Sequence, residues 1–94
     1  MANEYSYPLS FDWTTEEMVA VVEFYQAIEE AYEKGITRDK VMTHYKKFKE
    51  VVRSIAEEKT SFREFEEASG YSAYPVVKAA KEGQERIRLT KKTK

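Results

Sequence analysis

Residues 65–75 read Phe-Glu-Glu-Ala-Ser-Gly-Tyr-Ser-Ala-Tyr-Pro, and this stretch predicts the end of one helix, a tight corner and the start of the next. Gly70 can take the left-handed conformation that ends helices at little cost. Ser72 can cap the following helix, and Pro75 falls in its first turn, where a missing N–H group does no harm. The stretch therefore predicts two helices that meet at a sharp corner.

Two further helices are predicted upstream, and each begins at a capping residue. Thr14 and Glu17 fit a capping box, in which a hydroxyl and a carboxylate satisfy each other's backbone N–H groups. This first helix should end at Gly35, and Thr37 should cap the second. Apolar residues at helical spacing predict the buried faces: Met18, Val21, Val22, Tyr25, Ile28 and Tyr32 in the first helix, and Val41, Tyr45, Phe48 and Val52 in the second.

The second helix is expected to end near residue 54. Ser54 followed by Glu57 is another capping box, so a third helix should start there. One long helix that bends at this point is the alternative. The third helix is expected to face inward with Ile55, Phe62 and Phe65.

The N-terminal segment 5–13 is expected to be extended. Pro8 fixes its own φ and disfavours helix at the residue before it. Larger side chains alternate with smaller or polar ones, namely Tyr5, Tyr7, Leu9, Phe11 and Trp13. We expect one side of this arm to lie on the helices, because apolar burial contributes about 25 cal/mol per Å².

The fourth helix should bury Val76, Val77 and Ala80 and should weaken at Gly83. Residues 84–94 carry five bases and one acid, and we expect them to be a flexible basic tail. The prediction is an all-α fold, a compact array of about four helices with an extended aromatic arm across it. Residues 1–83 would form the single helical domain.

The composition indicates one soluble domain. The chain has 94 residues, of which 35% are charged and 14% are aromatic, and this aromatic content predicts a packed core. The absence of cysteine excludes a disulfide scaffold, thiolate metal sites and cysteine nucleophiles. No apolar run approaches the roughly 20 residues that span a bilayer, and the first residues do not resemble a signal peptide. The expected location is a reducing cytoplasm.

Charge alternates along the chain, although the net charge is only −1. Residues 1–37 carry eight acids and one base, whereas residues 38–56 carry two acids and six bases. Residues 57–67 are again acidic, and residues 68–94 are basic. Such alternation favours contacts between unlike faces and differs from the uniformly basic surface of a dedicated nucleic-acid binder.

No motif indicates catalysis, a cofactor or a metal. His44 is the only histidine, and a metal site would need two or three further ligands at suitable spacing. Adjacent glutamates diverge by about 100° on a helix and are typical of solvated faces. Neither a Gly-x-Ser-x-Gly elbow nor a glycine-rich phosphate loop occurs. We expect no catalytic, cofactor-binding or metal-binding residue and no enzyme, with a site of glutamates and tyrosines between helices as the weakest of the alternatives.

Nucleic-acid binding is the main alternative function. The spacing of residues 65–80 resembles a helix-turn-helix motif, and the basic tail can contact phosphates. However, Glu66 stands where a small residue is usual, and Pro75 lies inside the would-be recognition helix. The first turn of that helix also offers no Arg, Asn or Gln to read bases.

The predicted interaction residues are Tyr71 and Tyr74, which flank the start of the fourth helix, and the basic strip Lys46, Lys49 and Arg53 on the second. Tyrosine combines a large apolar area with a polar tip and is enriched at interfaces. Packing of both tyrosines on Trp13 or the arm is the alternative. The leading function is a non-enzymatic protein–protein interaction module with an unknown protein partner or, as a homodimer, a second copy. Neither nucleic acid nor a membrane is the expected partner.

Two stretches together resemble a known family. They are Glu4-Tyr5-Ser6-Tyr7-Pro8-Leu9 with Asp12-Trp13-Thr14-Thr15-Glu16-Glu17, and Phe65-Glu66-Glu67-Ala68-Ser69-Gly70-Tyr71-Ser72. Their order and spacing are similar to uncharacterised protein family 0223, small proteins of Bacillus-type bacteria. The resemblance covers residues 4–82. It implies a compact helical fold in a cytoplasmic bacterial protein, and it implies no reaction, ligand or catalytic residue.

Overall fold

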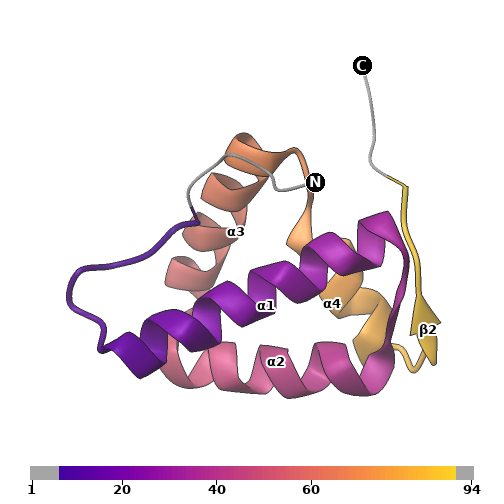
Figure 1. Cartoon of the computed structure of the whole chain (residues 1–94), viewed down its shortest axis with the longest axis horizontal. Helices are drawn as coiled ribbons and strands as arrows, with labels where there is room; N and C mark the ends of the chain where they lie inside the picture. Colours follow the sequence, from indigo (N-terminus) through magenta and orange to yellow (C-terminus); the bar gives the residue numbers. More distant parts are fainter. Residues whose placement is uncertain (1–6, 91–94) are drawn as a thin grey trace.

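The computed structural model describes residues 7–90 and has an all-α architecture with one very small sheet (Figure 1). The elements follow in the order α1 (Thr15–Glu33), β1 (Ile36–Thr37), α2 (Arg38–Val51), α3 (Ile55–Ser69), α4 (Ala73–Lys81) and β2 (Arg86–Ile87). Helices α1 and α2 lie side by side and run in opposite directions, α3 stands at a steep angle to both, and α4 packs against all three. The predicted fold class is confirmed.

The capping residues set the helix boundaries much as the sequence predicts. Thr14 and Glu17 form both hydrogen bonds of the capping box at the start of α1. Thr37 accepts a hydrogen bond from the backbone N–H of Lys40, and Ser54 accepts one from Glu57, so α2 and α3 are separate helices. Gly70 ends α3 with a φ of +82°, a left-handed conformation that glycine adopts cheaply.

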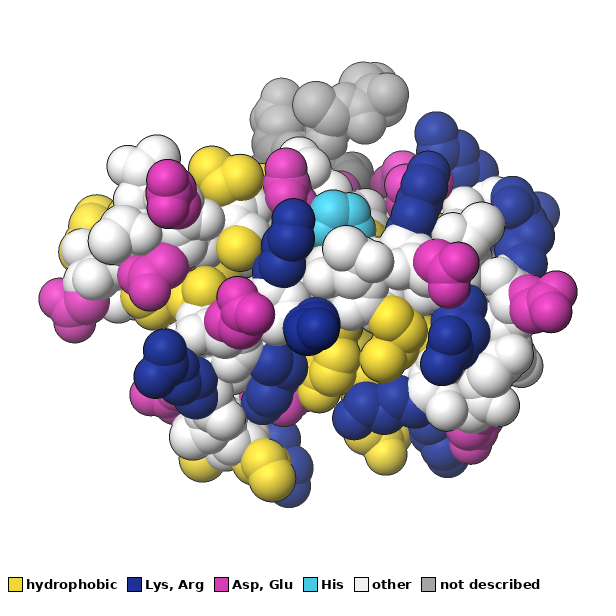
Figure 2. All heavy atoms as spheres, turned by 90° about the horizontal axis from the view of Figure 1, so that it is seen from below, with side chains coloured by type: hydrophobic (Ala, Val, Ile, Leu, Met, Phe, Trp, Pro, Cys, Tyr) yellow, Lys and Arg dark blue, Asp and Glu magenta, His cyan; other side chains and the backbone are white. Residues whose placement is uncertain are grey.

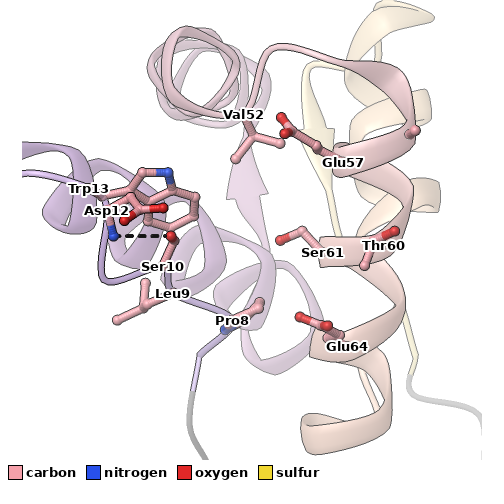
Figure 3. A pocket seen from close by; sticks show the side chains of 11 residues that line it. Pro8, Leu9, Ser10, Asp12, Trp13, Val52, Glu57, Thr60, Ser61 and Glu64 are labelled. Carbon is pink, nitrogen blue, oxygen red and sulfur yellow. Dashed lines mark hydrogen bonds between the residues drawn. The ribbon is translucent and has the colours of Figure 1, made fainter.

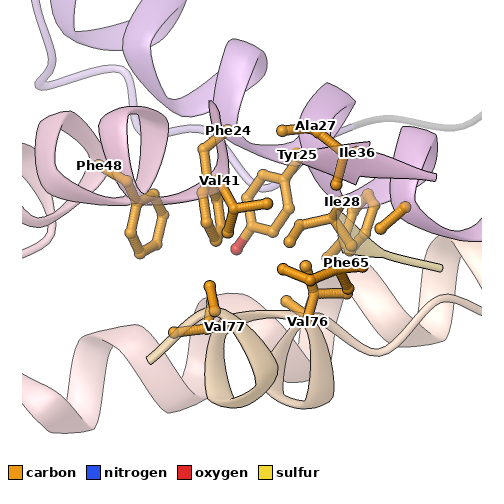
Figure 4. Packing of buried hydrophobic residues seen from close by; sticks show 14 of the residues in the cluster. Phe24, Tyr25, Ala27, Ile28, Ile36, Val41, Phe48, Phe65, Val76 and Val77 are labelled. Atoms are coloured by element: carbon orange, nitrogen blue, oxygen red, sulfur yellow. The ribbon is translucent and has the colours of Figure 1, made fainter. Parts of the chain in front are cut away.

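One buried cluster joins the four helices and contains most of the predicted stripe residues (Figure 4). Aromatic rings form its centre: Phe24 stacks on Phe48 with ring centroids 4.4 Å apart, and Tyr25 stacks on Phe65 at 4.2 Å. Phe24 was not in the predicted stripe. It is buried because α2 packs on one side of α1 and α3 on the adjacent side, which makes the buried face of α1 wider than a single stripe.

The packed part of the chain extends beyond residue 83, where the sequence placed the end of the helical domain. Strand β2 pairs antiparallel with β1, with Ile36 opposite Ile87, and the Ile87 side chain is fully buried. The backbone N–H of Leu89 donates to the carbonyl of Ala31. Residues 84–89 therefore belong to the packed part of the chain, to which Ile87 contributes buried apolar surface. Residues 91–94 lie outside the described range.

The arm is partly as predicted. Tyr7 stacks on Tyr25 and Phe65, and Trp13 is half-buried against the core. Phe11, in contrast, is fully exposed, because residues 11–12 form a turn that breaks the expected alternation. The prediction for Tyr5 lies outside the described residues.

Two smaller expectations also differ from the structure. Ile55 is 67% exposed, because it is the first residue of α3 and precedes the turn that packs on the core. Ser72 occupies the N-cap position of α4 without a side-chain capping bond, and its carbonyl instead accepts a hydrogen bond from Tyr32. Between residues 7 and 90, no helix has both the length and the apolar character needed to cross a membrane.

Candidate functional site

A groove lies between the N-terminal arm and α3, and it is here called the arm groove (Figure 3). Its volume is about 470 Å³, within the range of roughly 300–1,000 Å³ that is usual for ligand sites. Its lining comes from the arm (Pro8, Leu9, Ser10, Asp12 and Trp13), from the end of α2 (Val52) and from α3 (Ala56, Glu57, Thr60, Ser61 and Glu64).

The arm wall is held in place by contacts of Tyr7 with α1 and α3. The Tyr7 hydroxyl donates a 2.8 Å hydrogen bond to Oε2 of Glu29, and its ring stacks on Tyr25. Burial, together with the neighbouring Glu29 carboxylate, raises the pKa of Tyr7 to about 12. A turn at Ser10 then brings Trp13 to the groove. The backbone N–H of Trp13 donates to the carbonyl of Ser10, and the backbone N–H of Asp12 donates to the Ser10 hydroxyl.

The opposite wall is one face of α3. Residues three, four and seven apart share a helix face, so Glu57, Thr60, Ser61 and Glu64 line up along the groove. Ser61 is buried at its base and is hydrogen-bonded to the hydroxyl of Tyr25. Burial raises the pKa of Tyr25, so this phenol stays neutral and serves as a structural partner of Ser61.

The groove combines apolar surface with carboxylates. Leu9, Trp13, Val52 and Ala56 supply the apolar part, while Asp12, Glu57 and Glu64 are the charged residues of the lining, which includes no Lys, Arg or His. Leu9, one of the five large apolar side chains that are exposed among residues 7–90, lines the groove. Exposed apolar side chains beside a groove are typical of a binding surface.

The arrangement suits binding better than catalysis. Among the described residues, no hydrogen bond joins the hydroxyl of Ser10, Thr60 or Ser61 to a carboxylate of the lining that would activate it as a nucleophile, and the Ser61 hydroxyl is engaged by Tyr25. Over residues 7–90, no three His, Asp or Glu side chains come together as a metal site would require. The groove can therefore accept an apolar side chain and pair its carboxylates with cations.

The two predicted interaction tyrosines differ in their exposure to solvent. Tyr71 is half-buried, stacks on Tyr32 with ring centroids 4.9 Å apart and donates a hydrogen bond to Glu33. Burial, with Glu33 as a further cause, raises the pKa of Tyr71. Tyr71 thus ties the corner to the end of α1, whereas Tyr74 is 63% exposed and free to contact a partner.

The predicted basic strip and these tyrosines lie on different elements. Lys49 pairs with Glu58 at 2.6 Å in the first turn of α3, whereas Tyr71 follows the last turn of that helix. Lys46 and Arg53 are exposed, and the Arg53 Nε donates to the carbonyl of Glu50. On the α2 side of the molecule, Lys and Arg are interspersed with acidic and apolar side chains (Figure 2).

His44 is half-exposed on α2, and its Nδ1 atom is buried without a hydrogen-bond partner among the described residues. Within residues 7–90, His44 belongs to no group of three candidate metal ligands.

The helix that follows the α3–α4 corner is largely buried. Five of the nine residues of α4 are buried, namely Ala73, Val76, Val77, Ala79 and Ala80. A helix-turn-helix protein needs the first turn of its second helix exposed to the DNA groove. Here Ala73 of that turn is fully buried, whereas Tyr74 and Pro75 are exposed, and the turn is preceded by the bond from Tyr32 to Ser72.

Sequence reasoning missed the arm groove. The available signals were the aromatic arm and the seven-residue spacing of Glu57 and Glu64, which places both on one face of α3. Nothing in the pattern indicated that the arm would stand off this face instead of covering it. The gap between the arm and α3 depends on the turn at Ser10 and on how the arm packs on the helices.

Comparison with known proteins assigns the chain to a family. A family model described as Uncharacterised protein family (UPF0223) matches residues 4–88. The chain belongs to the UPF0223 family. The match ends one residue after Ile87, so the family region includes strand β2.

Relatives in the UPF0223 family are bacterial. A UPF0223 protein of Lysinibacillus sphaericus is 66% identical over 79 residues, which cover 84% of this chain and 83% of the relative. A UPF0223 protein of Bacillus pumilus is 56% identical over 82 residues, covering 87% and 92%. One from Enterococcus faecalis is 52% identical over 87 residues, covering 92% and 95%. The similarity thus spans nearly the whole fold.

Proposed function

We propose that this UPF0223 protein is a non-enzymatic binding module of the bacterial cytoplasm, which holds an apolar segment of a partner protein in the arm groove. The observation that carries this proposal is the groove itself, with exposed Leu9 and half-buried Trp13 facing α3 across an open space. An apolar side chain that enters this space is removed from water, and burial of that kind drives most protein association.

The helical scaffold supports this role. The α3 wall is fixed by Phe65 in the core and by the Ser61–Tyr25 hydrogen bond, and the arm wall is fixed by Tyr7. Both walls are therefore formed before a partner arrives, which lowers the entropy lost on binding. The single indole of the chain, Trp13, would be the main apolar anchor, as tryptophan is at many interfaces.

A matched pair of variants tests the proposal. Ala56→Phe places a ring in the groove, whereas Ala68→Phe places the same ring on an exposed site of α3 outside the lining. A library of random twelve-residue peptides displayed on phage is selected on the wild type, and the enriched peptides are then measured on both variants. We expect peptides that bind the wild type and Ala68→Phe but lose at least tenfold in affinity for Ala56→Phe.

Two results would count against the proposal. Enrichment of no peptide that is sensitive to Ala56→Phe would remove the arm groove as a binding site. Sedimentation velocity that shows a wild-type dimer, converted to monomer by Ala56→Phe alone, would replace the partner protein with a second copy of this chain.

A further inference from the structure

All charged residues in the lining of the arm groove are acidic. Asp12 stands on the arm wall, and Glu57 and Glu64 stand on α3, all three of them exposed. None makes an ion pair with another described residue, since the ion pair of residues 7–90 joins Lys49 to Glu58. These carboxylates are therefore available to a ligand, and the groove has a negative potential with no cation in its lining to offset it.

The carboxylates also have a defined spacing. Glu57 and Glu64 are seven residues apart on α3, which sets them two turns or roughly 10 Å apart along the helix axis. Figure 3 shows Glu57 near Val52 at one end of the groove and Glu64 near Pro8 at the other. The apolar surface of Leu9 and Trp13 lies between these ends on the opposite wall.

We infer that the occupant is a basic segment of the partner protein, with an apolar side chain flanked by two Lys or Arg residues whose cations reach the two carboxylates roughly 10 Å apart. The inference rests on the proposed function, because it gives the chemistry of the occupant of the same groove. The apolar side chain packs on Trp13, and the two cations pair with Glu57 and Glu64. Asp12 adds a third carboxylate beside the indole.

The same charges disfavour other classes of macromolecule. Nucleic acid and anionic membranes present phosphates, which three carboxylates in one groove repel. An acidic peptide is repelled for the same reason. The negative charge of the groove thus favours a basic peptide over the other ligands that its apolar surface alone would accept.

The test uses the peptides selected on the wild type and two triple variants with the same change in net charge. Asp12→Asn, Glu57→Gln and Glu64→Gln neutralise the groove, while Glu23→Gln, Glu67→Gln and Glu82→Gln neutralise exposed acids outside it. We expect the selected peptides to carry paired Lys or Arg about an apolar residue. Their affinity should fall about tenfold for the groove triple variant and less than about twofold for the control, since each exposed pair contributes modestly.

Salt dependence gives a second readout. Raising the salt from about 50 mM to about 300 mM should weaken binding to the wild type by several fold and binding to the groove triple variant much less. Circular dichroism verifies that both triple variants are folded.

The outcomes separate this inference from the proposed function. Peptides that depend on the groove but lack basic residues, or that bind the groove triple variant as tightly as the wild type, would overturn the basic occupant and leave the binding module standing. Absence of any peptide sensitive to Ala56→Phe would overturn both.

Discussion

The hydroxyl of Tyr7 donates a hydrogen bond to the carboxylate of Glu29 across 22 residues of sequence, at 2.8 Å. This bond, with the stacking of the Tyr7 ring on Tyr25 and Phe65, fixes the arm on α1. The arm is one wall of the arm groove, so the position of Tyr7 decides whether the groove exists.

Removal of this hydroxyl should destabilise the protein while leaving the ring contacts intact. We expect Tyr7→Phe to lower the free energy of unfolding by about 1 kcal/mol, because a half-exposed hydrogen bond to a charged acceptor is lost. Urea denaturation measures this, with exposed Tyr74→Phe as the control that stays within about 0.5 kcal/mol. Equal stability of the two variants would show that the bond to Glu29 contributes nothing.

Stability should fall at alkaline pH because of the buried phenols. Burial, together with Glu29 and Glu58 respectively, raises the pKa of Tyr7 and of Tyr45 to about 12. In the unfolded chain these phenols lose their protons near pH 10, so between about pH 10 and 12 the folded state binds more protons. The free energy of unfolding therefore decreases as pH rises through this range.

The double variant Tyr7→Phe, Tyr45→Phe tests this linkage. Its free energy of unfolding, measured by urea denaturation at about pH 9 and pH 11, should decrease less with pH than that of the wild type or of Tyr74→Phe. An identical decrease in all three proteins would assign the alkaline effect to other groups.

Phe24 and Phe11 compare the same residue type in the core and on the surface. Phe24 is fully buried and stacks on Phe48, whereas Phe11 is fully exposed. Phe24→Ala should cost about 3–5 kcal/mol through lost burial and a cavity, and Phe11→Ala should stay within about 0.5 kcal/mol. Thermal or urea unfolding compares them directly. A cost above about 2 kcal/mol for Phe11→Ala would mean that the turn at residues 11–12 packs on the core.

Truncation tests the boundary of the packed domain. A chain that ends at Thr90 keeps β2 and the bond from Leu89 to Ala31, whereas a chain that ends at Gly83 loses Ile87 from the core. We expect the first to retain the stability of the full chain and the second to lose at least about 2–5 kcal/mol, as for removal of a buried isoleucine. Comparable stability of the two truncated chains, by chemical denaturation, would instead place the end of the domain at residue 83, as the sequence predicts.

Local signals were sufficient for the helices and insufficient for the groove. Thr14, Thr37, Ser54 and Gly70 act through neighbours a few residues away, so sequence alone located these boundaries. Ile87 was missed because its burial depends on pairing with Ile36, more than 50 residues earlier, in strands too short to show alternation. The candidate site was missed for a related reason: its two walls come from the arm and from α3.

Fluorescence of Trp13 tests the central claim most directly, because it is the single tryptophan of the chain and lines the arm groove. The wild type is titrated with a basic peptide from the selection, and the indole emission is compared with the heat of binding in the same buffer. We predict a saturable change in Trp13 emission with the affinity that calorimetry gives, and its loss in Ala56→Phe. Heat of binding without any change in Trp13 emission would place the peptide elsewhere and contradict the arm groove as the binding site.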